Sequence, residues 1–312
     1  MLDFQELQIF LAAAETENFS EAGRRLNISQ PAISMQIHAL EVRLGVELFH
    51  RSGRYISLTD AGRTLMPLAR DLVNRMTQVE ETMLSLRGEV MGLLRLALST
   101  TSGKYVLPRL IARLHERYPR VQVLCHVTSR EQAVQMLLEG EVQVALTSLR
   151  EPYRDLEYRP LLVDHLQLVA RPDHPFAQRS GPVRPPDLPE ASFILREESS
   201  GTYMAVKDGL AWHGIGMDQL RTAMTFGSSE AIALSIEEGM GVSFLSELVV
   251  EPAVSEERLC VIPVEGLELT QTLYLAHHLG RPATRAQTAF WEFCFAPENE
   301  DIRHTPRLAL TT

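Results

Sequence analysis

The 312-residue sequence contains no apolar run that approaches the roughly 18 residues of a membrane-spanning helix. Its first segment, MLDFQELQIF, is acidic and amphipathic, unlike a secretory signal peptide. These absences predict a cytoplasmic protein without a membrane partner. With 45% hydrophobic and 22% charged residues the composition is globular, and the length exceeds what one core usually serves, so we expect several domains.

Cysteine is scarce and the common catalytic motifs are absent. Cys125, Cys260 and Cys294 are odd in number and lack CxxC or histidine-linked zinc spacing, which favours buried, reduced thiols. The sequence has no GxSxG, HExxH, Walker A or GxGxxG motif. His277 and His278 are adjacent in a predicted strand, so their rings point to opposite faces and make a poor metal pair. We therefore predict no metal, no cofactor and no enzymatic activity.

Positive charge is also lacking. The net charge is −10, and the first 60 residues hold five arginines against eight acidic residues, a net charge of −3. A protein that coats nucleic acid regardless of sequence needs a basic surface, so the charge argues against that class. Four of these arginines lie near the DNA-binding motif described next. The acidic residues Asp3, Glu6, Glu15 and Glu17 belong to a first helix that can point away from DNA.

The segment 18–38, NFSEAGRRLNISQPAISMQIH, is interpreted as a helix-turn-helix. Ser20 can cap one short helix, and Ser29 followed by Gln30-Pro31 can begin a second one that stops at Gly45. A buried stripe is predicted along the second helix at Ile33, Ile37, Leu40 and Leu44. The opposite side of its first two turns carries Pro31, Ser34, Met35 and His38, which are left to contact bases. An ordinary three-helix packing unit is the alternative.

The next segment, HRSGRYISLT, predicts two short strands around Ser52-Gly53, with Arg51 and Arg54 at the tip. Arginines on both sides of a tight turn suit a wing that lies along phosphates or the minor groove. With these motifs the segment AETENFSEAGRRLNISQPAISMQIHALEVRLGVELFHRSGRYISLTDAGRTL resembles the winged helix-turn-helix of the LysR-type transcriptional regulators. The resemblance implies sequence-specific binding of double-stranded DNA by Ser29, Gln30, Pro31, Ser34, Met35, His38, Arg51 and Arg54. Met35 offers no hydrogen bond, so we expect an apolar contact such as a thymine methyl group.

A long helix is predicted from a cap at Thr59 to about Arg87. Its apolar residues recur at intervals of three and four, close to a coiled-coil seam: Leu65, Leu68, Leu72, Met76, Val79, Met83, Leu86 and Val90. One helix cannot bury such a narrow seam, which predicts dimerisation, with packing on its own domain as the alternative. The resemblance favours the dimer, because LysR-type regulators join two winged domains through this helix. Twofold symmetry then predicts an operator of inverted half-sites. Gly88 and Gly92 mark a hinge.

From Leu93 to about Phe295 short apolar strands alternate with helices, which is typical of an α/β fold with a largely parallel sheet. Two segments recur with nearly the same offset. Ser102-Gly103-Lys104-Tyr105 returns 98 positions later as Ser200-Gly201-Thr202-Tyr203. The set Ser129, Glu131, Glu139 and Gly140 returns 99 positions later as Ser228, Glu230, Glu238 and Gly239. The repeat predicts two similar α/β lobes.

Hydroxyl side chains cluster where these strands end and helices begin. Open α/β sheets bind ligands at the carboxyl ends of their strands, and helix N-termini offer N–H groups to anions. If the lobes face each other, four stretches converge on one cleft: Ser99 to Ser102, Thr128 with Ser129, Ser199 to Thr202, and Ser228 with Ser229. A role as N-caps alone is the alternative for each residue.

The resemblance adds that LysR-type regulators carry a two-lobed effector domain similar to periplasmic binding proteins, with a small-molecule inducer between the lobes. ILREESSGT, from Ile194, and FGSSEAI, from Phe226, are similar to that family's effector-loop segments. Together with the hydroxyl clusters, this predicts effector contacts at Ser99, Thr100, Thr101, Thr128, Ser129, Ser200, Thr202, Gly227 and Ser228. Arg130 and Arg196 are candidate counter-charges for an anionic ligand, with surface solvation as the alternative. The hydroxyl-rich helix starts favour a small organic acid or an inorganic oxyanion.

These features predict a winged domain over 1–58, a linker helix over 59–88, a two-lobed effector domain over 89–295 and a disordered tail over 296–312. Lobe crossings are expected near Asp164-His165 and near Val264-Glu265, which gives lobe I about 93–163 and 266–295 and lobe II about 165–264. The predicted function is that of a dimeric or tetrameric, effector-responsive transcriptional regulator, with RNA polymerase as a further partner. A cytoplasmic small-molecule receptor and an enzyme built on the α/β domain are the alternatives, which DNA-binding and turnover assays would distinguish.

Overall fold

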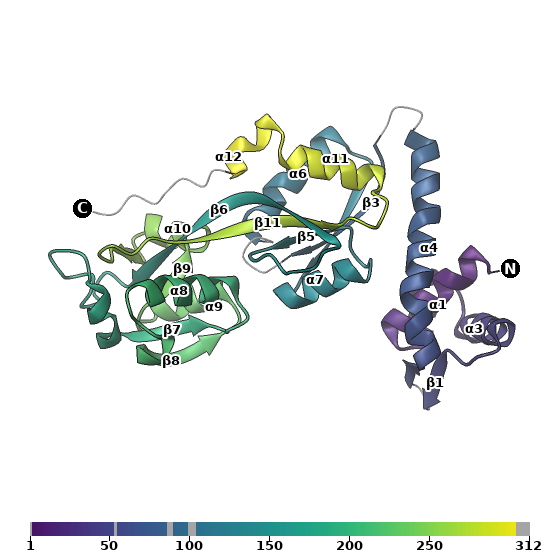
Figure 1. Cartoon of the computed structure of the whole chain (residues 1–312), viewed down its shortest axis with the longest axis horizontal. Coiled ribbons are helices and arrows are strands. Elements are labelled where there is room, and N and C mark those ends of the chain that lie inside the picture. The colour runs from purple at the N-terminus through teal and green to yellow at the C-terminus, as the bar shows by residue number, and fades with distance from the viewer. Residues whose placement is uncertain (1, 53–54, 86–89, 99–103, 304–312) are drawn as a thin grey trace.

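The computed structural model describes residues 2–52, 55–85, 90–98 and 104–303. A helical head with a two-stranded wing is followed by one long helix and an elongated two-lobed α/β body (Figure 1). The head contains α1 (Phe4–Thr16), α2 (Phe19–Leu26), α3 (Gln30–Leu44), β1 (Phe49–Ser52) and β2 (Tyr55–Leu58). The long helix is α4 (Asp60–Ser85), and Thr59 caps it by accepting from the Gly62 N–H at 3.1 Å. The predicted helix-turn-helix, wing and long helix are all present.

Each lobe of the body combines strands with covering helices. The first lobe holds β3 (Gly92–Leu98), α6 (Leu107–Arg117), β4 (Val121–Val127), α7 (Arg130–Leu138), β5 (Val144–Thr147) and α11 (Arg285–Cys294). The second holds η1 (Pro185–Glu190), β7 (Ser192–Arg196), α8 (Gly201–Trp212), η2 (Met217–Gln219), β8 (Arg221–Phe226), α9 (Ser229–Glu237), β9 (Ser243–Ser246), α10 (Glu247–Ser255) and β10 (Cys260–Ile262). Two long strands, β6 (Leu156–Ala170) and β11 (Leu269–His278), lie side by side and join the lobes (Figure 1).

The caps and core of the head correct two predictions. Asn18, not Ser20, caps α2, because its side chain accepts from two N–H groups of the first turn. Ser29 caps α3 as predicted, and Gly45 ends that helix in the left-handed conformation. Leu44 is 37% exposed and does not belong to the buried stripe.

The buried position at the end of α3 is taken by Glu41. Its Oε1 accepts from the Leu48 N–H at 2.9 Å and from the Phe49 N–H at 3.3 Å. These two amides belong to the turn that leads into the wing and need an acceptor in the interior. Burial of a carboxylate here therefore satisfies the backbone that follows the helix.

Two acidic residues of α1, the helix that the sequence suggested could point away from DNA, pair with arginines. Glu6 accepts two hydrogen bonds from Arg43, which lowers the pKa of this carboxyl against the opposing effect of its burial. Glu15 pairs with Arg25 and, through its other oxygen, with Arg70 of α4. The arginines near the DNA-binding motif are thus partly neutralised within the head itself, which limits its non-specific attraction for DNA.

The main sheet is mixed rather than largely parallel. Its strand order is β10-β6-β11-β5-β3-β4, with β9 also paired to β6. Strands β3, β4 and β5 pair in parallel, as do β7 and β8, whereas every pairing of β6 and β11 is antiparallel. The reason is topological, since these two strands carry the chain between the lobes in opposite directions.

The paired strands also locate the two crossings. Asp164 on β6 lies opposite Gln271 on β11. Leu269 packs in the core of the second lobe and Leu273 in that of the first. The first crossing agrees with the prediction at Asp164-His165, but the return crossing lies at Gln271, after Val264-Glu265. We call the level of Asp164 and Gln271 the waist.

The second pair of repeated segments is confirmed in three dimensions, whereas Ser102 and Gly103 of the first pair lie outside the described residues. Ser129 and Ser228 are the N-caps of α7 and α9. Glu139 and Glu238 are the corresponding C-caps. The glycines that follow have φ of 74° at Gly140 and 86° at Gly239, a conformation that favours glycine. Each repeat therefore encodes one helix together with both of its ends.

The tail is ordered further than predicted. Residues beyond Phe295 form η3 (Pro297–Asn299) and α12 (Glu300–Arg303), and Ile302 is buried in the core of the first lobe. The buried Asn299 donates to the carbonyl oxygen of Phe293 at 2.8 Å, and Arg113 binds Asp301. The prediction of a disordered tail is therefore wrong as far as residue 303, and residues 304–312 lie outside the described part.

Polar contacts dock α4 against the first lobe. Arg281 donates to Asp71 of α4 and to the carbonyl oxygens of Leu137 and Leu138 at the end of α7, at 2.8 to 2.9 Å. Asn74 donates to the carbonyl oxygen of Gly140 at 3.1 Å. Closer to the body, the predicted hinge residue Gly92 has φ of 123°, and an added Cβ would lie 2.2 Å from the Glu81 carboxylate of α4. Gly88, the other predicted hinge residue, lies outside the described residues.

A buried polar cluster occupies the waist. Asp164 is fully buried and accepts from the Ser246 hydroxyl at 2.8 Å and from the Gln271 amide at 2.7 Å. Burial raises the pKa of Asp164 to about 6 despite these two hydrogen bonds, and the nearby Glu247 carboxylate acts in the same direction. The charged form of Asp164 is therefore destabilised in the folded protein relative to the unfolded chain.

We predict that Asp164→Asn stabilises the protein above pH 6. The pKa of Asp164 is about 6 in the folded protein against an ordinary value of 3.8. The wild type therefore loses stability as the pH rises from 3.8 to about 6. Asparagine retains an acceptor for Gln271 and carries no charge, so the free energy of unfolding should increase by about 1–3 kcal/mol at pH 7.5. The gain should shrink as the pH falls from 6 toward 4. Urea unfolding across this range measures it.

The control is Asp173→Asn, a carboxylate whose side chain is 67% exposed in the loop that follows β6. The effect of Asp173→Asn on the free energy of unfolding should be small and should not change across the same pH range. Equal pH dependence of stability in the wild type and in Asp164→Asn would contradict the assignment of this titration to Asp164.

Candidate functional site

The outer side of α3 is free over its first turns. Met35 is 73% exposed, and Gln30, Pro31 and His38 are exposed as well, while Ser34 is half-buried. None of these side chains is covered by the described part of the chain. Ser29 is also exposed, but its hydroxyl accepts from the Ala32 N–H at 3.3 Å and so serves as the N-cap. The helix presents a short, largely uncharged surface of a width suited to the major groove.

The wing contributes one predicted arginine and one aromatic residue that the sequence reasoning missed. Arg51 is exposed, but it pairs with Glu41 at 3.0 Å and lies over the Phe19 ring, so its reach toward a phosphate is restrained. Arg54 lies outside the described residues. Tyr55 is 76% exposed at the start of β2. The alternation with the buried Ile56 was the signal that could have identified Tyr55 as outward-facing.

One face of α4 exposes a row of large apolar side chains. Leu68, Leu72, Met76, Val79 and Met83 are each 45% to 61% exposed. At the ends of the predicted seam, Leu65 packs partly against the head and Val90 partly against the first lobe, while Leu86 lies outside the described residues. The opposite face of α4 makes the polar contacts to the first lobe. The five exposed residues are hereafter called the α4 stripe.

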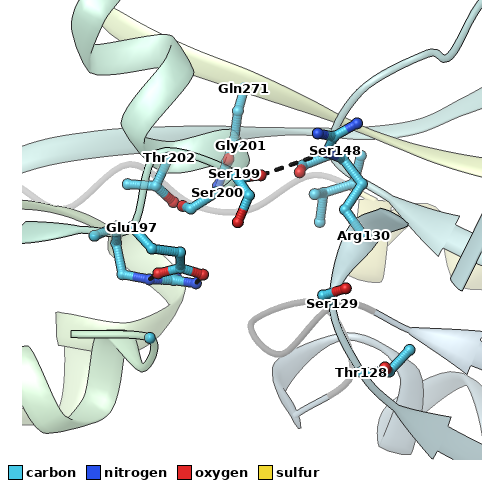
Figure 2. Close-up of a pocket in the computed structure, with 13 residues that line it drawn as sticks. Thr128, Ser129, Arg130, Ser148, Glu197, Ser199, Ser200, Gly201, Thr202 and Gln271 are labelled. Atoms are coloured by element: carbon cyan, nitrogen blue, oxygen red, sulfur yellow. Dashed lines mark hydrogen bonds and ion pairs between the residues drawn. The ribbon is translucent and has the colours of Figure 1, made fainter. Parts of the chain in front are cut away.

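A pocket of about 160 Å³ lies between the lobes beside the waist. Figure 2 shows hydroxyl groups and an arginine from the two lobes facing each other across it. Its lining contains five of the nine predicted effector residues, Thr128, Ser129, Ser200, Thr202 and Gly227, together with Arg130, Ser148, Arg196, Glu197, Ser199, Gly201, Gln271 and Leu273. Ser99, Thr100 and Thr101 lie outside the described residues.

Two helices begin at the pocket, one from each lobe. Ser129 caps α7 by accepting from the Gln132 N–H, and Ser200 caps α8 by accepting from the Tyr203 N–H. Both serines therefore act as N-caps and line the pocket at once. The lobes are in close contact here, since a Cβ added to Gly201 would lie 2.1 Å from the Ser148 hydroxyl oxygen. The positive ends of two helix dipoles meet in a narrow space.

Arg130 and Arg196 line the pocket rather than the solvated surface. The Arg130 side chain is 15% exposed, pairs with Glu131 and Glu151, and donates to the Ser199 carbonyl oxygen of the other lobe at 3.5 Å. Arg196 binds both oxygens of Glu197 at 2.8 Å and donates to the Ser229 hydroxyl at 2.8 Å. Although burial opposes it, this pairing lowers the pKa of Glu197. Both guanidinium charges are held in place and partly neutralised.

Ser228 does not line the pocket, in contrast to the prediction. It caps α9, and its hydroxyl donates to Glu230 at 2.8 Å. Glu230 also pairs with Lys104 of the first lobe at 2.9 Å. Burial opposes the ionisation of Glu230, but the hydrogen bonds from Lys104 and Ser228 lower its pKa. The lobes are thus joined by an ion pair on the side where the prediction placed a ligand contact.

The described residues contain no cluster of three or more histidine, cysteine, aspartate or glutamate side chains placed to hold a metal ion. None of the described helices is long and apolar enough to cross a bilayer. Cys294 is buried, which raises its pKa, but Cys125 and Cys260 are only half-buried, so the prediction of three buried thiols holds for one.

Family models match both parts of the chain. The model described as a bacterial regulatory helix-turn-helix protein of the lysR family matches residues 4–63, and the LysR substrate binding domain matches residues 87–296. The RuBisCO operon transcriptional regulator of Allochromatium vinosum is 32% identical over 94% of this chain and 95% of its own length. The HTH-type transcriptional regulator YeiE of Escherichia coli K12 is 31% identical over 94% of this chain and 97% of its own.

Solved structures share the fold. The regulatory domain of Synechocystis CcmR, in complex with 2-PG, is 30% identical and covers 65% of this chain and 96% of its own, with a TM-score of 0.59. Full-length CbnR in complex with its target DNA covers 94% of this chain and 99% of its own at 22% identity, with a TM-score of 0.66. On these matches and the fold, the chain belongs to the LysR family of transcriptional regulators, DNA-binding proteins with a small-molecule effector domain.

Proposed function

We propose that this regulator binds a small anion between its lobes and transmits its presence to the DNA-binding head. The observation that carries the proposal is the pocket itself, where α7 and α8 begin opposite one another beside Arg130 and Arg196. Helix N-termini and arginines together form an anion site. The relative CcmR, whose regulatory domain is complexed with 2-PG, supports a small ligand for this domain.

The charge of the pocket restricts the anion. Arg130 already faces Glu131 and Glu151, and Arg196 already faces Glu197, so little uncompensated positive charge remains on the two side chains. The remaining attraction comes from the N–H groups and dipoles of the two helices. We infer that the ligand is a compact organic acid or oxyanion that fits among the hydroxyl groups.

We propose that DNA is read by the outer side of α3, namely Gln30, Pro31, Ser34, Met35 and His38, and that Arg51, Arg54 and Tyr55 on the wing contact the backbone or minor groove. The α4 stripe then pairs with the same stripe of a second copy and presents two heads to inverted half-sites. The complex of CbnR with its target DNA supports this arrangement. DNA binding would place the protein in the cytoplasm, with RNA polymerase as a further partner.

We propose a route by which ligand binding in the pocket is transmitted to the DNA-binding head. Helix α7 begins at the pocket with Arg130, and its last carbonyls, those of Leu137 and Leu138, bind Arg281, which holds Asp71 of α4. A ligand that favours one lobe arrangement would move α7 as a unit and shift the angle of α4. We propose that no catalytic step is involved, because Ser129 and Ser200 serve as helix caps and no histidine is among the described residues that line the pocket.

We propose a division into a DNA-binding domain over residues 1–58, a linker helix over 59–88 and an effector domain from 89 that includes the packed residues up to 303. The burial of Ile302 in the first lobe supports this extension beyond the predicted boundary at 295.

Replacement of Ser34 or His38 by alanine is expected to weaken binding to the operator by about tenfold, because each direct base contact contributes about 1–3 kcal/mol of discrimination. Gel shift against the DNA that flanks the gene measures this, with circular dichroism to confirm the fold. His213→Ala, which removes an exposed histidine from the second lobe, is the control and should bind as the wild type does. Unchanged affinity and specificity in both α3 variants would refute the assignment.

A charge in the α4 stripe should dissociate the dimer. Leu72→Glu places a carboxylate on a side chain that is 45% exposed in the single chain and would be buried between two copies. Analytical ultracentrifugation should show monomers at micromolar concentration, with operator binding lost alongside. Leu279→Glu, at an exposed leucine of the first lobe, is the matched control and should leave the oligomer intact. A dimeric Leu72→Glu variant would contradict the role of the stripe.

Gly227 allows the pocket to be filled without backbone strain, because no atom lies within 4 Å of an added Cβ. Gly227→Leu is expected to retain operator binding and to lose the increase in melting temperature that sulfate or 2-PG gives the wild type. Gly181→Leu is the control, since that glycine is equally open and lies outside the pocket. A full ligand response in Gly227→Leu, or no response in the wild type, would refute the proposed anion site.

A further inference from the structure

The waist contains more buried hydrogen-bond acceptor atoms than donor hydrogens that can pair with them. The Gln271 side-chain N–H donates to Asp164, and the Oε1 of the same amide is buried without a partner. Glu247 receives one hydrogen bond from Gln167 at 2.6 Å, while its Oε2 is buried without a partner. Ser246 already donates to Asp164. Such orphaned acceptors are costly, and one additional hydrogen in the cluster would relieve the deficit.

The cluster touches the proposed anion site through a single side chain. Gln271 lines the pocket, and the same amide binds Asp164 at 2.7 Å. An anion in the pocket would therefore lie one side chain away from the buried Asp164 carboxylate, which already experiences the charge of Glu247. In an interior of low dielectric constant, this like-charge repulsion favours neutralisation of the carboxylate that is easiest to protonate.

We propose that the regulator binds its anion together with one proton, which Asp164 takes up from solvent, and that Gln271 couples the two events. The proton ends on the Asp164 Oδ2 that now faces Gln271. The Gln271 amide then turns, so that Oε1 accepts from the new O–H and the N–H₂ group takes the place of the orphaned oxygen beside the pocket. The hydrogen deficit is relieved, and an N–H donor replaces an acceptor next to the bound anion. This inference rests on the proposed anion site.

The neighbouring groups support Asp164 as the site of protonation. Burial raises its pKa to about 6, and Glu247 at the start of α10 is the charged group that faces it. The elements packed on its other sides contribute Gln271 of β11 and Ser246 of β9, which do not titrate. In the pocket itself, Glu197 has a lowered pKa and stays ionised, and no histidine is among its lining residues in the described part of the chain. Between pH 5.5 and 7.5 Asp164 is thus placed to change its charge.

The test is the affinity for sulfate, which stays doubly charged across this range, measured by calorimetry on the full chain from pH 7.5 to 5.5. In the wild type the dissociation constant should fall by about fivefold or more as the pH decreases, because linkage makes proton uptake and anion affinity reciprocal. Asp164→Asn mimics the neutral carboxyl, so its affinity should depend much less on pH and should exceed that of the wild type at pH 7.5. Asp173→Asn, with an exposed side chain, should retain the wild-type slope.

A second measurement counts the proton directly. At pH 6.5 the observed binding enthalpy should differ between MES and imidazole buffers for the wild type, as expected for uptake of a fraction of a proton, and should not differ for Asp164→Asn. Equal pH slopes or equal proton uptake in the wild type and Asp164→Asn would overturn the inference while leaving the anion site in place. No binding of sulfate at any pH would overturn the proposed anion site and this inference with it.

Discussion

One buried guanidinium, that of Arg70, holds the three parts of the molecule together. Its side chain is only 5% exposed; it donates to Glu15 of the head at 3.0 Å and lies 2.8 Å from Glu141 of the first lobe, a charge contact without hydrogen-bond alignment. A buried charge of this kind is tolerated because carboxylates surround it. Arg70 itself belongs to α4, so the head, the long helix and the body meet at this residue. The orientation of the DNA-binding head relative to the effector domain depends on that meeting point.

The contrast with the interiors of the parts is informative. The head and each lobe have their own apolar cores, built around Phe10, Phe290 and Phe193. Helix α4 joins the head through apolar contacts such as that of the buried Ala69, whereas its contacts to the body and those between the lobes include ion pairs such as Arg281 with Asp71 and Lys104 with Glu230. When two parts separate, water replaces the hydrogen bonds that their polar groups lose, whereas exposure of an apolar core to water is costly. The parts therefore keep their shape while their relative positions can change at small cost, as a two-state regulator requires.

Periodicity and caps were sufficient to predict what is local. The apolar spacing of α3 as far as Leu40, the cap at Ser29 and the two short strands of the wing depend on neighbours in sequence, and the structure agrees. The choice between Asn18 and Ser20 as a cap was not decided by pattern, since both side chains can accept from the first turn. The predicted helix starts were also sufficient to group Thr128, Ser129, Ser200 and Thr202, which line one pocket in the structure.

Features that depend on distant segments were not predictable in the same way. Glu41 is buried because two amides of a later turn need its oxygens, and β6 is antiparallel to β11 because of how the chain returns. Gln271 enters the pocket from that return strand, well after the last lining loop, that of Gly227, and no motif marks it. Arg130 and Arg196 pair with their sequence neighbours Glu131 and Glu197, but the proximity of Glu151 to Arg130 is revealed only by the fold.

Stability alone does not explain the buried polar groups of the waist. An apolar pair at Asp164 and Gln271 would pack the waist without orphaned acceptors, and buried polar clusters are often less stable than such replacements. Both residues nevertheless lie where the lobes join, on the two strands that any lobe movement must bend. Hydrogen bonds at this level have directional alternatives, such as a turned amide or an added proton, whereas a packed apolar contact has one arrangement. A waist that can satisfy its hydrogen bonds in two ways would suit the proposed function, in which the ligand selects between lobe arrangements.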